Sequence, residues 1–123
     1  MISGRFGELG ELFFEVEIVA ADGENFPLEV LLDTGFTSGF LTIDIQDADS
    51  LGWSILKRNL TMRTVKKNEY FDLYEGRVIL DRQEYIIPVV AGEGVQETLL
   101  GLQWLKILPL AVNFSTGLLT LGE

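Results

Sequence analysis

Short stretches of alternating apolar and polar residues, separated by turn signals, constrain the fold of this chain most strongly. Within residues 12–20, three apolar side chains share one face and two glutamates lie between them. A period of two is typical of a strand with one buried face. Asp22-Gly23 provides a turn signal, and a second extended segment follows at 26–32. The two segments are therefore predicted to form a β-hairpin.

The second segment runs into an acidic residue. Residues 30–32 are Val-Leu-Leu, and Asp33, Thr34 and Gly35 follow directly. A carboxylate is strongly hydrated, so its position against a buried strand costs free energy unless it is hydrogen-bonded or neutralised. Asp and Gly are also among the commonest turn residues. The tripeptide alone is thus compatible with a plain turn and with a functional site.

Further extended segments are expected along the rest of the chain. They are predicted at 41–43, 53–62, 69–80, 84–90, 110–114 and 118–121. The segments 53–62 and 69–80 form a candidate hairpin with a polar break at 64–68. Helical spacing after Gly101 predicts one short helix that ends at Pro109. The expected fold is mostly β, with short strands that close as a small barrel or sandwich and one short C-terminal helix.

An acidic stretch at residues 44–51 is predicted to begin a short helix, with Asp44 or Asp47 as its N-cap. The cluster of Asp44, Asp47 and Asp49 also raises a calcium-binding loop as an alternative. Neither register supplies the central glycine together with a Glu at the twelfth loop position. We therefore expect no metal at this cluster.

Composition removes several kinds of chemistry. The 123 residues include no cysteine and no histidine. Disulfides, thiolate nucleophiles, Ser-His-Asp and Cys-His mechanisms and the commonest zinc ligands are therefore excluded. Catalysis would fall to carboxylates, Lys, Tyr or a carboxylate-bound metal.

Length and charge bound the class of protein. A chain of 123 residues is expected to form one domain, 1–123. Nineteen acidic residues against nine basic ones give a formal net charge of −10, which argues against nucleic acids and anionic membranes as partners. The first eight residues lack the apolar core of a signal peptide, and no apolar run approaches the roughly 20 residues of a membrane-spanning helix. We expect a cytoplasmic protein.

Three segments, taken in order, resemble the retropepsin-type aspartic proteases. They are LLDTGFTSGF at 31–40, LLGLQWL at 99–105 and LAVNF at 110–114. More narrowly, the chain resembles a small prokaryotic aspartyl-protease-like group whose motif reads Asp-Thr-Gly-Phe. The resemblance extends over about residues 11–121 and depends on the order and spacing of the motifs rather than on any one of them.

This resemblance implies a small closed barrel of the retropepsin (acid protease) type and an aspartic endopeptidase that uses no cofactor and no metal. Asp33 would be the catalytic residue, and Thr34 and Gly35 would support its loop. The second motif that supports the site would be Leu99, Leu100 and Gly101.

A homodimer is implied as well. Such enzymes use two carboxylates, and the chain has one Asp-Thr-Gly, so Asp33 of each subunit would meet its copy at a twofold axis. The substrate would be a peptide or protein. The termini, above all residues 118–121, are expected to interleave at the interface.

One segment departs from the family. Retropepsins close a glycine-rich hairpin, the flap, over the substrate. The candidate flap at 62–70 contains no glycine and carries a lysine pair. Candidate substrate contacts are Phe36, Val65 and Lys66. Two alternatives therefore stay open: a protease-fold module that binds peptides or dimerises without cleaving, and an unrelated small β-barrel with a chance Asp-Thr-Gly.

Overall fold

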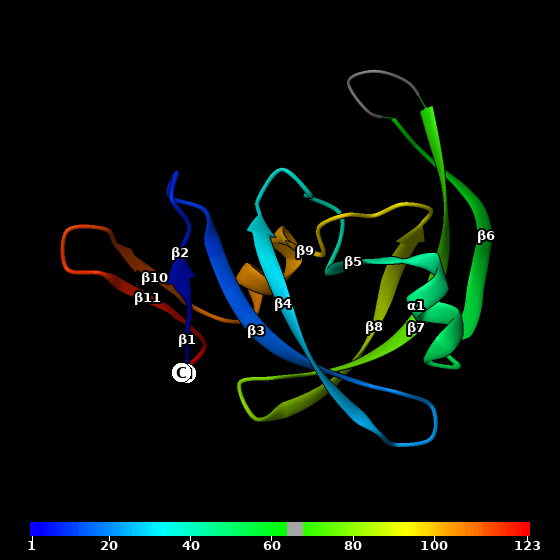
Figure 1. Cartoon of the computed structure of the whole chain (residues 1–123), viewed down its shortest axis with the longest axis horizontal. Coiled ribbons are helices and arrows are strands. Elements are labelled where there is room, and N and C mark those ends of the chain that lie inside the picture. The colour runs from blue at the N-terminus through cyan, green and yellow to red at the C-terminus, as the bar shows by residue number, and fades with distance from the viewer. Residues whose placement is uncertain (64–67) are drawn as a thin grey trace.

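The computed structural model describes residues 1–63 and 68–123, apart from the side chains of residues 62–69 (Figure 1). The part of the chain that it describes is almost entirely strands and turns. The elements are β1 (Ile2–Ser3), β2 (Arg5–Phe6), β3 (Leu12–Val19), β4 (Asn25–Asp33), β5 (Leu41–Asp44), α1 (Ile45–Ser50), β6 (Ser54–Arg63), β7 (Asn68–Leu80), β8 (Gln83–Gly92), β9 (Leu99–Gly101), the 3₁₀ helix η1 (Leu102–Lys106), β10 (Leu110–Asn113) and β11 (Leu118–Leu121).

The larger sheet closes into a barrel. Its strand order is β2-β3-β4-β9-β5-β8-β7-β6, and β3 also pairs with β7. This extra pairing joins β3, β4, β9, β5, β8 and β7 into a ring, whereas β2 and β6 extend beyond it. Closure pairs the ring strands on both sides, and in the described part of this sheet the unpaired edges lie on β2 and β6. The predicted mostly-β closed barrel is confirmed.

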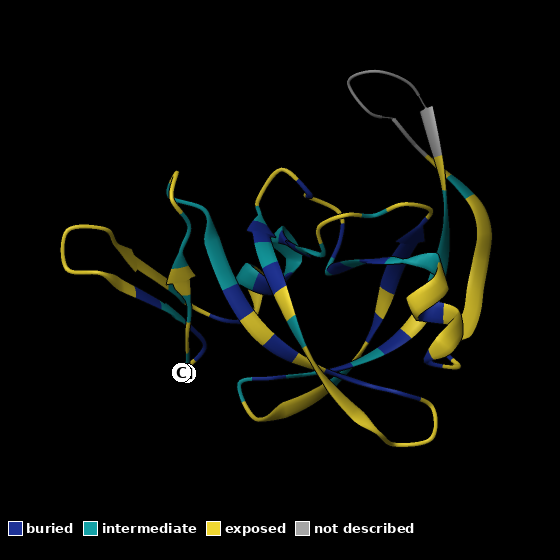
Figure 2. Ribbon diagram, viewed as in Figure 1, coloured by how far each residue is buried: buried dark blue, intermediate teal, exposed yellow. Residues whose placement is uncertain are grey.

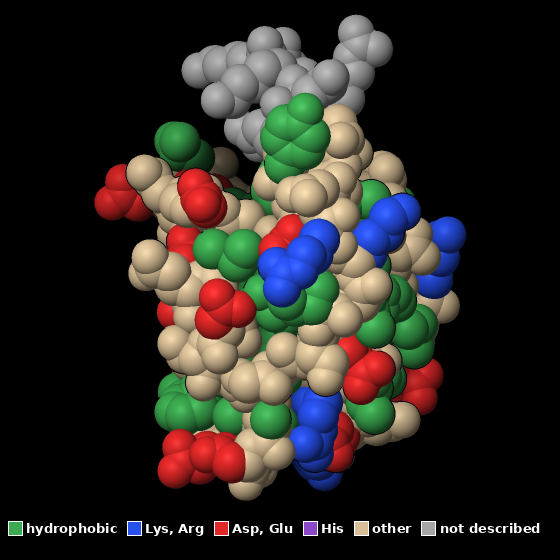
Figure 3. All heavy atoms as spheres, turned by 90° about the vertical axis from the view of Figure 1, so that its right-hand side faces the viewer, with side chains coloured by type: hydrophobic (Ala, Val, Ile, Leu, Met, Phe, Trp, Pro, Cys, Tyr) green, Lys and Arg blue, Asp and Glu red, His purple; other side chains and the backbone are tan. Residues whose placement is uncertain are grey.

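The predicted hairpin of β6 and β7 is also present, and it projects from the barrel at the right of Figure 1. Its pairing shifts register on either side of Lys57, and Asn59 adopts a positive φ of 55°. The backbone N–H of Asn59 donates a hydrogen bond of 3.0 Å to the carboxylate of Asp72. Such irregularities, with charged side chains, protect the unpaired edge of an outer strand. The face on which β6 lies mixes basic, acidic and hydrophobic side chains (Figure 3).

A smaller sheet stands beside the barrel, with the order β1-β11-β10. The hairpin of β10 and β11 points away from the barrel at the left of Figure 1. We expected residues 118–121 to interleave with a second subunit. In the structure β11 lies between β1 and β10 of its own chain, so both of its edges are already paired. Within this sheet the outer strands are β1 and β10.

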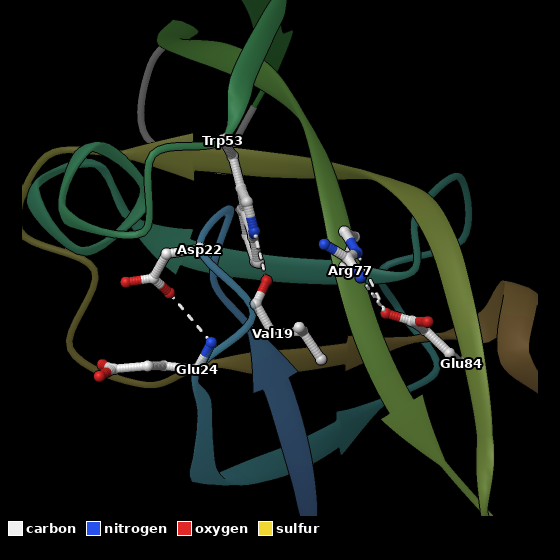
Figure 4. A network of polar contacts seen from close by, with 6 residues as sticks. All are labelled: Val19, Asp22, Glu24, Trp53, Arg77 and Glu84. Carbon is white, nitrogen blue, oxygen red and sulfur yellow. Dashed lines mark hydrogen bonds and ion pairs between the residues drawn. The ribbon is translucent and has the colours of Figure 1, made fainter.

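The core fills the barrel, and its side chains follow the predicted alternation. Phe14, Val16 and Ile18 on β3 are all buried. Figure 2 shows buried segments along the barrel strands, whereas β6 and the β10–β11 hairpin are mostly exposed. Both tryptophans are buried in the core. Each indole N–H has an acceptor: Trp53 donates to the carbonyl of Val19 over 2.8 Å (Figure 4), which satisfies the polar group of a buried aromatic.

Polar contacts at the surface stabilise two of the turns. In the β3–β4 turn the backbone N–H of Glu24 donates to the Asp22 carboxylate over 2.9 Å (Figure 4). At the β7–β8 hairpin Arg77 pairs with Glu84 across the strands at 2.8 Å. This pair is largely exposed, so it contributes less than about 1 kcal/mol.

The two short helices differ from each other in how they begin. Asp44 caps α1 as predicted, because its carboxylate accepts a hydrogen bond of 2.9 Å from the N–H of Gln46. The helix predicted to reach Pro109 is shorter than expected: η1 ends at Lys106 and is a 3₁₀ helix. Gly101 gives it no side-chain cap, and a turn so short commonly adopts 3₁₀ geometry. No helix in the described residues is long and apolar enough to cross a membrane.

Candidate active site

The two motifs that are distant in sequence lie side by side in the barrel. β4 pairs in parallel with β9, and the register sets Leu31 opposite Leu99 and Asp33 opposite Gly101. The N–H of Leu31 extends this ladder with a hydrogen bond of 2.9 Å to the carbonyl of Thr98. The ends of the two strands therefore meet at the point where Asp33 leaves the sheet.

Asp33 is held by the turn that it begins. Its Oδ1 accepts a hydrogen bond of 2.8 Å from the N–H of Gly35, and its carbonyl accepts one of 3.1 Å from the N–H of Phe36. The side chain is only half-buried, and its Oδ2 has no hydrogen-bond donor among the described residues. The turn thus fixes one carboxylate oxygen and leaves the other free for chemistry. This arrangement is compatible both with the turn that Asp-Gly predicted and with a site.

Gly35 is suited to its position by size. A Cβ at this residue would lie 3.0 Å from Oδ1 of Asp33, which is tighter than nine in ten real Cβ contacts. Thr34 lies between them, exposed, and its hydroxyl makes no hydrogen bond within the part of the chain that the structure describes. The surface over the carboxylate therefore consists of small residues, which permit close approach of another molecule.

Phe36 supports the loop that begins at Asp33 through its buried ring. Its ring is buried and packs over Gly39, where a Cβ would overlap the ring. A Cβ at Gly101 would likewise overlap the carbonyl oxygen of Gly39 and lie 2.9 Å from Cδ2 of Phe36. The three residues interlock, and only glycine fits at two of the positions. Phe36 was predicted to contact substrate; the structure assigns it to packing, and a contact with substrate stays a prediction.

Backbone hydrogen bonds join the Asp33 loop to the second motif. The N–H of Gly101 donates to the carbonyl of Phe40 over 2.9 Å, and the N–H of Leu102 donates to the carbonyl of Phe36 over 3.0 Å. The N–H of Leu99 donates to the side-chain oxygen of Thr42 over 2.9 Å. These hydrogen bonds give the predicted supporting role of residues 99–101 a geometric basis. The role itself stays a prediction.

Two further residues, which the sequence analysis did not place at the site, also hold the Asp33 loop. Nε2 of Gln103 donates a hydrogen bond of 2.6 Å to the carbonyl of Thr37. Nε1 of Trp104 donates one of 2.8 Å to the carbonyl of Phe40, and its buried ring packs edge-on against Phe40 and Tyr85. Their position directly after Gly101 was the only sequence signal for this role.

The described strand ends on either side of residues 64–67 lie at the same end of the barrel as the loop that follows β4, at the top of Figure 1. Val65 and Lys66, the other predicted substrate contacts, lie outside the described residues. The second motif adds no acidic side chain to the loop, since residues 99–101 are Leu-Leu-Gly. One chain therefore presents Asp33 as the single carboxylate of these two motifs.

Two of the three clustered aspartates in the acidic stretch at 44–51 have hydrogen-bond partners within the chain. Asp44 is occupied as the cap of α1, and Asp49 accepts a hydrogen bond of 2.7 Å from the hydroxyl of the buried Tyr74. Burial and this hydrogen bond raise the pKa of Tyr74 to about 12. These two aspartates therefore have structural partners of their own.

A closed barrel in which an Asp-Thr-Gly loop packs on a Leu-Leu-Gly strand is the retropepsin-like fold. Among solved structures, the chain is similar to a retropepsin-like aspartic protease from Rickettsia conorii, with a TM-score of 0.60 and 18% sequence identity. The likeness covers 98% of this chain and 88% of that one. No protein-family model and no curated protein matches the sequence. At this identity the likeness shows the fold alone.

Proposed function

We propose that the protein is an aspartic endopeptidase that acts as a homodimer, with Asp33 of each subunit forming the catalytic pair. The observation that carries this proposal is the setting of Asp33. It ends β4 in register with Gly101, its Oδ1 is fixed by the N–H of Gly35, and its Oδ2 has no donor among the described residues. A plain turn would not require the interlocked support beneath the loop.

The need for a partner follows from the chemistry. Two carboxylates that share one water cannot both ionise, so the pair retains one proton over a range of pH. One chain offers only Asp33 in its two motifs, and a twofold axis supplies the second copy from the same loop. The exposed Thr34, next to Asp33, would brace the loop of the other subunit.

Hydrolysis then needs no histidine and no cofactor. The ionised Asp33 accepts a proton from water as the oxygen attacks the peptide carbonyl carbon. The protonated Asp33 of the other subunit donates a hydrogen bond to the carbonyl oxygen and supports formation of the tetrahedral intermediate. A proton passes to the leaving nitrogen as the C–N bond breaks, and the pair returns to its singly protonated form.

The β10–β11 hairpin is the surface that we assign to the dimer. It projects from the barrel and exposes Val112, Phe114 and Leu118, with exposed fractions of 38%, 63% and 46%. β10 lies at an outer position of its sheet, so its backbone groups are available to pair with another strand. Because β11 is already paired on both edges, the contact would use β10 and the apolar side chains rather than interleaved termini.

The test compares wild type with Asp33→Asn on a mixed peptide library between about pH 3 and pH 7. Glu24→Gln is the matched control, because Glu24 is exposed and its side chain has no hydrogen-bond or ion-pair partner in the described residues. Size in solution is measured for all three proteins. We expect dimeric wild type and control to cleave, and dimeric Asp33→Asn to be inactive.

Cleavage that survives in Asp33→Asn, or a wild type that is monomeric at all concentrations and still cleaves, would contradict the proposal. A stable wild-type dimer that cleaves nothing would favour the second candidate, a module that binds peptides without cleaving them. The observation behind that candidate is the glycine-free, lysine-bearing sequence of the flap at 62–70.

A further inference from the structure

A hollow lies away from Asp33, between α1 and the outer end of the β3–β4 hairpin. Its volume is about 310 Å³, within the size range of small-molecule sites. Both of its sides lie at the right of Figure 1. The N–H of Ala21, in the β3–β4 turn, donates a hydrogen bond of 2.8 Å to the carbonyl of Leu51, just after α1. This bond ties the two sides together, so the hollow is preformed.

The floor and walls are apolar. Ile18, Ile43 and Leu51 are buried and form the deep part, with Leu28 half-buried beside them. Phe26 also lines the pocket and is 41% exposed, so its ring stands where the pocket opens to water. An apolar group that entered would remove these surfaces from water without disturbing any hydrogen bond of the sheet.

The polar lining offers acceptors only. Asp47 and Ser50 of α1 are the polar residues among the described lining, which includes no lysine or arginine. The Ser50 hydroxyl donates its hydrogen to the carbonyl of Gln46 over 2.9 Å, so it presents lone pairs to a ligand. The Asp47 carboxylate has no partner cation among the described residues. An incoming cation would therefore meet a free negative charge and no competing positive one.

We propose that this pocket binds a small amphiphilic amine, with an aromatic or branched-alkyl body on the apolar floor and an ammonium group at Asp47. Charge complementarity selects this chemistry: an ammonium gains charge-assisted hydrogen bonds from Asp47, whereas an anion of the same shape is repelled. The formal net charge of −10 further favours cations over anions. The inference is independent of Asp33 and holds whether or not the protein is a peptidase.

The test titrates the isotope-labelled full chain with tryptamine and records backbone amide NMR shifts. Indole-3-propionate, which carries a carboxylate in place of the ammonium, is the matched ligand. We expect tryptamine to shift amides of residues 26–28 and 43–51 with a dissociation constant of about 0.1–1 mM, and the anion to bind far more weakly.

Variants locate the contact. Asp47→Asn should weaken tryptamine binding by roughly two- to fivefold, as loss of an exposed ion pair does, and Asp47→Glu should retain it. Glu8→Gln, an exposed acid in the turn between β2 and β3, is the control and should change nothing. Phe26→Ala should also weaken binding, and Ile86→Ala, which removes an exposed apolar side chain elsewhere, should not.

Three results would overturn the proposal. They are the absence of shifts at these residues with about 5 mM tryptamine, equal affinity for tryptamine and indole-3-propionate, and unchanged tryptamine affinity in Asp47→Asn. Folding of each variant is verified from its amide spectrum, so a lost fold is distinguished from a lost ligand.

Discussion

The backbone of Gly101 packs so closely on the carbonyl oxygen of Gly39 that a single added methyl group would overlap it. This contact presses the second motif against the loop that begins at Asp33. The hydrogen bond of 2.9 Å from the N–H of Gly101 to the carbonyl of Phe40 lies beside it. The geometry of the candidate site thus depends on a residue that carries no functional group.

Gly101→Ala should therefore disturb both the fold and the site. The added Cβ meets backbone rather than a flexible side chain, so we expect a loss of about 2–4 kcal/mol in the free energy of unfolding, measured by denaturant titration. The control is Gly94→Ala, where a Cβ meets nothing within 4 Å and only the positive φ of 67° opposes it. That control should cost about 1 kcal/mol. Equal losses in the two variants would contradict the close packing at Gly101.

Tyr74 gives a prediction about alkaline pH. Its folded-state pKa is about 12, against an ordinary value of 10.0, so the folded protein retains this proton at pH values where the unfolded chain releases it. The resulting stabilisation is complete below about pH 10 and is lost as pH rises towards 12. Tyr74→Phe should lack this part of the alkaline loss, which amounts to at most about 2–3 kcal/mol.

The measurement is the free energy of unfolding at pH 8, 10 and 11 for wild type, Tyr74→Phe and Tyr70→Phe. Tyr70 is 69% exposed and is the matched control. At pH 8 Tyr74→Phe should be less stable than wild type by about 1–2 kcal/mol, through loss of the hydrogen bond to Asp49. A pH dependence that is the same in wild type and Tyr74→Phe would contradict the raised pKa.

A negative charge on the β10–β11 hairpin should weaken the proposed dimer. Val112→Glu on β10 places like charges near each other in a twofold contact, and we expect the dimer dissociation constant to rise at least about tenfold, measured by sedimentation. Peptidase activity should fall in proportion to the dimer at low protein concentration. Ile86→Glu, on an exposed apolar residue of β8, is the control and should leave the dimer intact. An unaffected dimer in Val112→Glu would exclude the hairpin from the interface.

Local sequence patterns predicted the strands well, because alternation reports directly on which face of a strand is buried. The hairpin of β3 and β4, the strand that ends at Asp33 and the cap at Asp44 all lie where these patterns indicate. The parallel pairing of β4 with β9 was not predicted. A periodicity of two fixes the faces of a strand and carries no information on its neighbours in the sheet.

The details of the site were harder to predict. Nothing in the residue type of Gln103 indicates that its side chain reaches the carbonyl of Thr37, since that contact forms only when the two motifs meet. The same holds for Trp104, a core residue that also donates to the carbonyl of Phe40. The length of η1 was overestimated. Helical spacing of apolar residues does not distinguish an α-helix from a 3₁₀ turn over so few residues.

The central claim, that one catalytic pair is built from Asp33 of two subunits, is tested most directly by mixed dimers. Wild type is equilibrated with an equal amount of Asp33→Asn, and peptidase activity is compared with wild type at the same total subunit concentration. Random pairing leaves roughly a quarter of the dimers with two intact Asp33 residues, so the account predicts roughly a quarter of the activity. Glu24→Gln, mixed in the same way, should leave the activity unchanged. An activity of about half in the Asp33→Asn mixture would show that each subunit acts alone and would contradict the shared pair.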